Sequence, residues 1–335
     1  MNENNLKYLL YADPQWIVNS FIGMPTNKSV MRKEDFPGII QTGMIQWVNA
    51  FDGDIGMPSL AQLRSYDIIH LNMPPSNFGK ARFIKSFVGK DTKVVINIDH
   101  AIDLWHSTGY TRMDILLKEI NAVDLTFCTE STASNSLEVF FDKTIPRIPH
   151  PVDLDGLSEI RFNKITDKKE KHIVVVGHRY DLNWLLPTMA VSKYKADSNE
   201  SLLTTYIGAL PDNPFDIYDS FDMVHPHMPF MDMMDYINSA DVVIDTAITK
   251  SYGRVPCECA ALGTPCISND SNESGKTLFP SLNVDIKNVR SIYEAIGRIL
   301  QPLQAMSIIR DSDLIIERYS NETLKDKMLG YLYDS

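Results

Sequence analysis

The 335-residue sequence has few cysteines, no excess of basic residues and no long apolar run. Its four cysteines, at positions 128, 257, 259 and 266, lack the paired C-x-x-C spacing of a zinc site and suggest buried, reduced thiols of a cytoplasmic protein. A net charge of -11 disfavours a protein whose main task is to grip a nucleic-acid backbone. No apolar stretch is long enough to span a bilayer, and the polar N-terminus is unlike a signal peptide. We therefore expect a cytoplasmic protein without a transmembrane segment.

The remaining pattern is that of an α/β protein long enough for two domains, with a hydrophobic content of 44%. Buried strands are predicted at 67–71, 93–98 and 124–128, and helices at 80–88 and 113–120 lie between them. Because strands that alternate with helices form parallel sheets, we expect a Rossmann-like domain here. Thr132 is predicted to cap a further helix that runs to Phe140.

A proline-rich segment, 146–153, is predicted to link two domains, since closely spaced prolines make the chain stiff and extended. The apolar run 172–177 beyond it reads as a strand buried on both faces. We therefore predict an N-terminal domain at 1–148 and a second domain at 149–310. The C-terminal helices at 311–335 have the potential to cross back to the first domain.

The stretch 241–270 combines a predicted strand at 241–245, a loop, a helix at 255–262 and a strand at 266–268. Gly253 allows the backbone to approach a ligand closely, and Pro256 suits the first turn of a helix. Backbone amides of residues 252–255 would then face an anion at the helix N-terminus. This arrangement predicts a phosphate-binding site.

Glu258 is expected in the same helix, one turn after the phosphate-binding site. A carboxylate there is able to accept hydrogen bonds from two ribose hydroxyls. The alternative interpretation is that the segment is ordinary scaffold and that Glu258 is a solvated helix residue.

The run 251–267 resembles the donor-binding stretch of retaining GT-B glycosyltransferases, with matches at Tyr252, Gly253, Glu258, Ala261, Gly263, Pro265 and Ile267. The resemblance implies two Rossmann-like α/β domains facing a cleft. It also implies transfer of a sugar from a nucleoside-diphosphate sugar with retention, and no metal or other cofactor. The donor-binding residues would be Ser251, Tyr252, Gly253, Arg254, Val255 and Glu258.

The same resemblance suggests three catalytic residues. His100 follows a predicted strand and would lie near the donor sugar. Arg179 would bind the donor diphosphate. In the family a lysine assists this arginine, but the position of that lysine falls on Trp184 here. Lys250 stands where the family has a glutamate, so it is expected either to replace the missing clamp lysine or to meet an acidic group on the sugar. A third possibility is that Lys250 marks a degenerate, inactive site. The Asp52-Gly-Asp54 triplet is interpreted as a turn and not as a metal site.

The sequence leaves several functions open beside glycosyl transfer to an unidentified acceptor hydroxyl. An epimerase or hydrolase of sugar nucleotides could use the same fold. A non-catalytic subunit that binds nucleotide sugars would explain the lost lysine and glutamate. A glycosyltransferase acting on bases in DNA also stays open, because acidic charge could lie outside its groove. The acceptor and the oligomeric state are not predicted.

Overall fold

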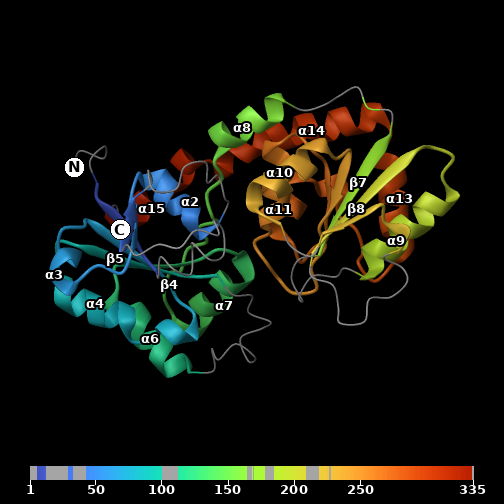
Figure 1. The fold of residues 1–335 in the computed structure, drawn as a ribbon. Coiled ribbons are helices and arrows are strands. Elements are labelled where there is room, and N and C mark those ends of the chain that lie inside the picture. The colour runs from blue at the N-terminus through green and yellow to red at the C-terminus, as the bar shows by residue number, and fades with distance from the viewer. Residues whose placement is uncertain are drawn as a thin grey trace. The chain divides into compact units, whose positions relative to one another are not determined.

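The computed structural model describes residues 6–12, 29–32, 43–99, 112–163, 168, 170–177, 185–208, 219–225 and 228–333. The chain forms two compact units, Met1–Asp153 together with Tyr319–Ser335, and Leu154–Arg318. Each unit is built on its own mainly parallel sheet (Figure 1). The fold class is therefore α/β with two Rossmann-like units, as the alternation of strands and helices predicted.

The first unit contains a six-stranded sheet in the order β2-β3-β1-β4-β5-β6. Strand β2 runs antiparallel to β3, and the other neighbours pair in parallel. The strands are β1 (Tyr8–Tyr11), β2 (Val30–Arg32), β3 (Asp54–Gly56), β4 (Ile68–Asn72), β5 (Lys93–Ile98) and β6 (Leu125–Cys128).

Helices cover both faces of this sheet. On one face, Trp47 of α2 and Met328 of α15 pack in a single buried cluster with Tyr8 and Phe127 of the sheet. On the other face, α4, α6 and α7 bury a second cluster that includes Ile84. Figure 1 shows these two layers of helices on opposite sides of the strands. The helices are α2 (Met44–Phe51), α3 (Leu60–Leu63), α4 (Lys80–Val88), α6 (Met113–Ala122), α7 (Ser131–Phe141) and α15 (Asn321–Tyr333), with a 3₁₀ turn at Pro75–Asn77.

The prediction that Thr132 caps α7 is wrong. Glu130 is the N-cap, and its carboxylate accepts hydrogen bonds from the backbone N–H groups of Thr132 and Ala133, both at 2.6 Å. The helix begins two residues earlier than a cap at Thr132 would allow, because the Glu130 carboxylate satisfies two free amides and also complements the positive end of the helix dipole.

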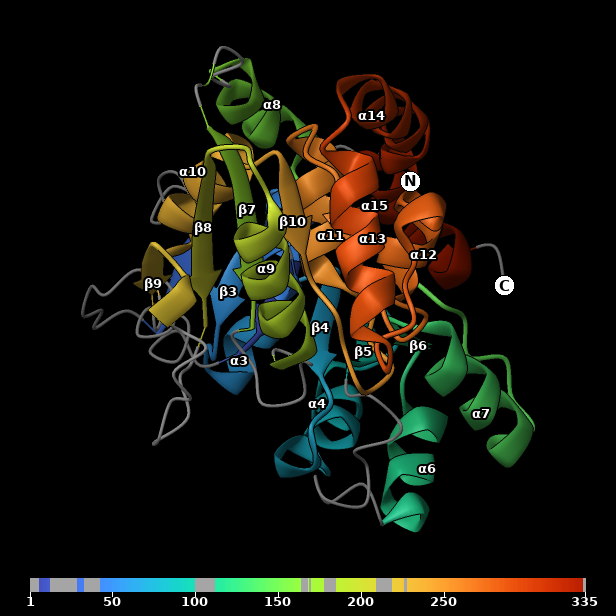
Figure 2. The same cartoon turned by 90° about the vertical axis from the view of Figure 1, so that its right-hand side faces the viewer.

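The second unit contains a five-stranded sheet in the order β11-β10-β7-β8-β9, parallel throughout. Helices α10 and α11 lie on one face of this sheet, and α9 and α13 lie on the other (Figures 1 and 2). The strands are β7 (Lys171–Val176), β8 (Leu202–Ile207), β9 (Met223–His225), β10 (Val242–Ile244) and β11 (Cys266–Ile267). The helices are α8 (Leu154–Phe162), α9 (Leu185–Asp197), α10 (Phe230–Ser239), α11 (Arg254–Ala261), α12 (Glu273–Leu278), α13 (Val289–Ile299) and α14 (Pro302–Ile316), with 3₁₀ turns at Pro280–Leu282 and Glu317–Tyr319.

The order of these strands reverses at β7. The chain moves from β7 through β8 to β9, and then returns to place β10 on the other side of β7. Helix α9, the next described element after β7, and helix α11, which follows β10, accordingly lie on opposite faces of the sheet. In open parallel sheets such a switch point creates the crevice in which ligands bind.

Within the described ranges, no helix is long and apolar enough to cross a membrane.

Candidate functional site

The candidate site lies where β10 ends and α11 begins, at the switch point of the second sheet. The loop between them is fixed to the segment that follows β11. Ser251 donates its backbone N–H to the carbonyl oxygen of Ser271 at 2.8 Å, and its own carbonyl oxygen accepts from the N–H of Glu273 at 3.1 Å. The loop is thus held on a second stretch of backbone before the helix starts.

Gly253 is the N-cap of α11 and has the left-handed backbone angle φ 82°. A Cβ at this position would lie 1.7 Å from Oδ1 of Asn272, so only glycine fits. As a glycine, Gly253 has no side chain with which to cap the helix at this end. The first backbone amides of α11 are therefore left for an anion, with the helix dipole in support.

Two asparagines that were not predicted as site residues support this loop. Asn272 donates from Nδ2 to Oδ2 of the buried Asp245 at 2.9 Å, and its Oδ1 accepts from the N–H of Gly275 at 3.1 Å. Asn269 bonds both the N–H and the carbonyl oxygen of Ala247, at 2.9 and 2.8 Å. The signal was the run of asparagines and serines at 268–275, which directly follows a buried strand.

Glu258 is fully buried, with an exposure of 0%. Its Oε1 lies 3.2 Å from Nε of Arg254, whose side chain is 32% exposed. The alternative interpretation of Glu258 as a solvated helix residue is therefore wrong. The structure places the two predicted donor residues, Arg254 and Glu258, against each other.

The side chains of Tyr252 and Val255 are also buried, at 5% and 2% exposure. The Tyr252 hydroxyl lies 3.2 Å from Sγ of Cys257, so the ring anchors the loop to the helix. These residues would serve a ligand through their backbone amides, whereas the half-buried Ser251 also has an accessible side chain.

Lys250 lies beside Asp270 at the rim of this loop. Its Nζ donates to the backbone carbonyl oxygen of Asp270 at 2.7 Å. Hydrogen bonds from Asn283 and Lys276 lower the pKa of the Asp270 carboxyl, and the charge of Lys250 lowers it further. Lys250 and Lys276 therefore place two ammonium groups near the Asp270 carboxylate.

The other two predicted catalytic residues, His100 and Arg179, lie outside the described residues. The strands that precede them are β5, which ends at Ile98, and β7, which ends at Val176. Asp99, directly after β5, accepts from the hydroxyl of Thr129 at 2.9 Å and lies 3.1 Å from Nε2 of the buried His150.

In the part of the chain that the structure describes, no group of three or more histidine, cysteine or acidic residues is arranged to hold a metal ion. Asp52 ends α2 in the left-handed conformation, and Oδ2 of Asp54 accepts from the Tyr66 hydroxyl at 2.8 Å, so this triplet forms the predicted turn. All four cysteines are free and buried. Burial and a hydrogen bond with Cys259 raise the pKa of the Cys266 thiol, which keeps it protonated and unreactive.

No family model matches the chain, and no curated protein sequence matches it either. Solved structures do match. Sucrose-phosphate synthase from Thermosynechococcus elongatus superposes with a TM-score of 0.65 at 13% identity, over 98% of this chain and 98% of that one. The trehalose 6-phosphate synthase of Burkholderia multivorans gives 0.63 at 11% identity, over 86% of this chain and 74% of that one. The E. coli trehalose-6-phosphate protein, bound with UDP-2-fluoro glucose, gives a TM-score of 0.61 at 12% identity, over 86% of this chain and 76% of that one.

The fold and the switch-point site together define the class of two-unit parallel α/β proteins. More specifically, the chain has the GT-B fold of glycosyltransferases, because the matched structures are glycosyltransferases of that fold. The motif at 251–267 predicted this fold. At such low identities the likeness concerns the fold alone.

Proposed function

We propose that this protein is a glycosyltransferase that uses a nucleoside-diphosphate sugar as its donor. The observation that carries the proposal is the open N-terminus of α11. Gly253 adopts its left-handed conformation at the switch point, and as the N-cap residue it has no side chain with which to cap the helix. Helix amides in this position stabilise the charge that develops on a departing diphosphate.

In this proposal the diphosphate lies against the amides of residues 253–255, and Glu258 binds the ribose after Arg254 has turned away from it. The freed guanidinium would then be available to the diphosphate, since Arg254 is the first residue of the helix. Arg179 completes the charge stabilisation, and His100 lies near the sugar. Retention of configuration, independence of metal and a cytoplasmic location belong to the same proposal. Retention and independence of metal rest on the likeness of the motif, and the cytoplasmic location rests on the free, buried cysteines.

The proposal is tested by thermal unfolding of the full chain with a panel of nucleoside-diphosphate sugars. A donor that binds only the folded protein raises the melting temperature by mass action. We expect one donor to stabilise the wild type, and Glu258→Gln to abolish most of that shift. Glu294→Gln is the matched control, because Glu294 forms the same kind of pair with Arg290, four residues before it, at 2.9 Å on the exposed face of α13.

An equal shift in Glu258→Gln and Glu294→Gln would contradict the ribose role, and a folded wild type that no donor stabilises would contradict the proposal itself. Analysis of the products then separates transfer from hydrolysis or epimerisation, and binding without turnover indicates a non-catalytic subunit.

The panel includes donors with a uronate sugar. If Lys250 meets the sugar carboxylate, Lys250→Glu should lose binding of these donors and keep that of neutral ones.

A further inference from the structure

The outer surface of α3 and α4, in the first unit, carries positive charge on an otherwise acidic chain. Residues 57–90 contain five basic residues and one acidic residue, whereas the whole sequence has 32 basic and 43 acidic residues. Both helices pack on the same face of the first sheet, because Leu63 and Ile84 belong to one buried cluster (Figure 1). We call five exposed residues on and beside these helices the basic face: Arg64, Lys80, Arg82, Phe83 and Lys90.

The positive charges of the basic face are available to a partner. Arg82 alone among its four cations forms an ion pair with a described residue, and this pair with the buried Glu119 is long, at 3.7 Å. Lys80 donates to a neutral amide oxygen at 2.7 Å. Arg64 donates to the backbone carbonyl oxygen of Phe87 at 3.1 Å and lies 4.5 Å from the centroid of its ring. These neutral contacts orient the cations and leave their charge unbalanced.

An apolar ring lies among these cations. The buried residues of α4 are Ala81, Ile84 and Val88, which lie on one side of the helix. Phe83 lies on the opposite side, and 55% of its surface is exposed. Lys80 precedes Phe83 by three residues, so the two share the outer side of α4. The basic face therefore combines unbalanced cations with an apolar group that water solvates poorly.

An anionic lipid surface suits both features. Each basic residue at such a surface strengthens binding about fivefold, and an aromatic ring buries itself at the boundary between headgroups and acyl chains. A nucleic acid or an acidic peptide would use the cations alone. The net charge of -11 also disfavours nucleic acid, whereas contact with a membrane needs only this one face.

We infer that the basic face binds the protein to an anionic lipid surface, with Phe83 inserted between headgroups and the four cations paired with headgroup phosphates and carboxylates. The contact is peripheral and reversible, because one ring buries far less apolar surface than a spanning helix does. The cytoplasmic leaflet of a cell membrane is anionic, which agrees with the location proposed above. The inference does not depend on the proposed donor site, which lies in the second unit.

The test is sedimentation of the full chain with vesicles made of equal parts of phosphatidylcholine and phosphatidylserine. Vesicles of phosphatidylcholine alone are the lipid control. At about 0.1 M salt, charges more than about 10 Å from the lipid are largely screened, so the acidic remainder of the chain does not mask a local contact. We expect the mixed vesicles to sediment the protein and the neutral vesicles to leave it in solution.

Two variants test the two features separately. Lys80→Gln/Lys90→Gln should weaken binding to the mixed vesicles about twentyfold, because it removes two cations. Phe83→Ser leaves the charge unchanged and should weaken binding about tenfold, as loss of a partly buried ring would. These side chains are exposed, so both variants should fold normally, which circular dichroism checks.

The matched controls lie in the second unit. Lys193→Gln/Lys287→Gln removes two exposed lysines, and Phe162→Ser removes a ring that is 91% exposed. Both should bind as the wild type does, and equal weakening in variants and controls would overturn the inference. Unchanged binding of Phe83→Ser would indicate a partner that reads charge alone and would overturn the lipid assignment. Failure to sediment with the mixed vesicles, or equal sedimentation with the neutral ones, would overturn it as well.

Discussion

At the scale of single residues, Gly253 is a position at which only glycine fits. Its φ of 82° and the position of Asn272 Oδ1, 1.7 Å from where a Cβ would lie, leave no room for alanine. We expect Gly253→Ala to lower the free energy of unfolding by about 1–3 kcal/mol, measured by urea denaturation. Gly297→Ala in α13 is the control, because the nearest atom would be at 3.5 Å there and helix propensity favours alanine by up to about 1 kcal/mol. Equal effects of the two substitutions would refute this account.

His70 is a buried base whose protonation opposes folding. Its Nε2 donates to Oδ1 of Asn97 at 3.1 Å, and its Nδ1 accepts from the Tyr8 hydroxyl at 2.6 Å. Burial and the charge of His150 lower its pKa from 6.5 to about 3. Between these two values the unfolded chain binds a proton that the folded protein does not, so stability is complete above pH 6.5 and falls as the pH decreases towards 3.

This group alone is expected to remove about 1.4 kcal/mol of stability per pH unit within that window. Chemical unfolding at a series of pH values should therefore give a shallower slope for His70→Gln than for the wild type. Tyr8→Phe keeps the imidazole and should keep the slope. A His70→Gln slope equal to that of the wild type would show that other groups govern the acid sensitivity.

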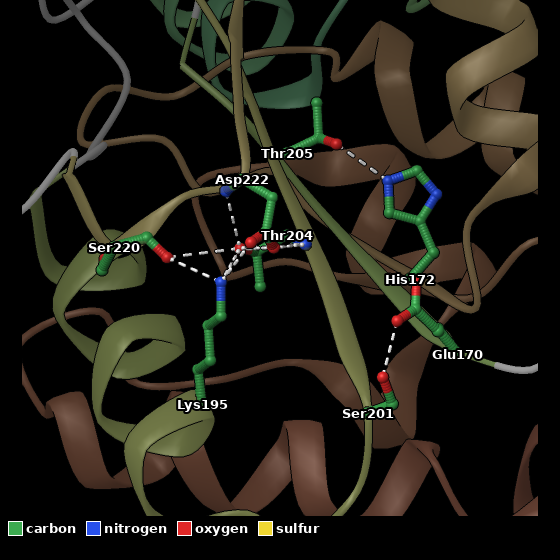
Figure 3. Close-up of polar contacts among 8 residues, drawn as sticks. All are labelled: Glu170, His172, Lys195, Ser201, Thr204, Thr205, Ser220 and Asp222. Atoms are coloured by element: carbon green, nitrogen blue, oxygen red, sulfur yellow. Dashed lines mark hydrogen bonds and ion pairs between the residues drawn. The ribbon is translucent and has the colours of Figure 1, made fainter.

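At the scale of elements, the edge strand β9 depends on Asp222, which precedes it. The Asp222 carboxylate accepts from Lys195 Nζ at 2.7 Å and from both the N–H and the hydroxyl of Thr204 at 2.8 Å (Figure 3). Burial by itself would raise the pKa of Asp222, but these hydrogen bonds outweigh it and lower the pKa. The stabilisation is therefore present near neutral pH and is lost as the pH falls through the lowered value.

Asp222→Ala should cost about 1–2 kcal/mol and speed hydrogen exchange of the amides in β9, because a three-residue strand makes few other bonds. Lys193→Ala, which breaks an exposed i,i+4 pair with Asp197 on the same helix as Lys195, should cost less than about 0.5 kcal/mol. Exchange in β9 that is unchanged by Asp222→Ala would contradict the role of this carboxylate.

At the scale of the whole molecule, the chain leaves the first unit after Asp153 and returns to it at Tyr319. Helix α15 completes the buried cluster around Trp47, and Met328 within it has an exposure of 0%. Met328→Ala should lower the free energy of unfolding of the first unit by about 2–4 kcal/mol, because it leaves a cavity.

Hydrogen exchange resolves the two units and should show the loss of protection in the first unit alone. Met306→Ala in α14 is the control, since that side chain is 67% exposed and its removal should cost less than about 0.5 kcal/mol. Loss of protection spread evenly over both units would contradict the separate core that includes α15.

Sequence patterns were enough to predict the α/β class, the bounds of α4 and β5, and the strand, loop and helix that carry Gly253. Apolar periodicity and glycine geometry are local properties, so a single sequence is enough to predict them. Tertiary structure decided which residues meet. Strand order placed the loop after β10 at the switch point, Asn272 came beneath Gly253 from a later segment, and packing buried Glu258 against Arg254. Such contacts depend on how distant segments pack, and no local pattern encodes them.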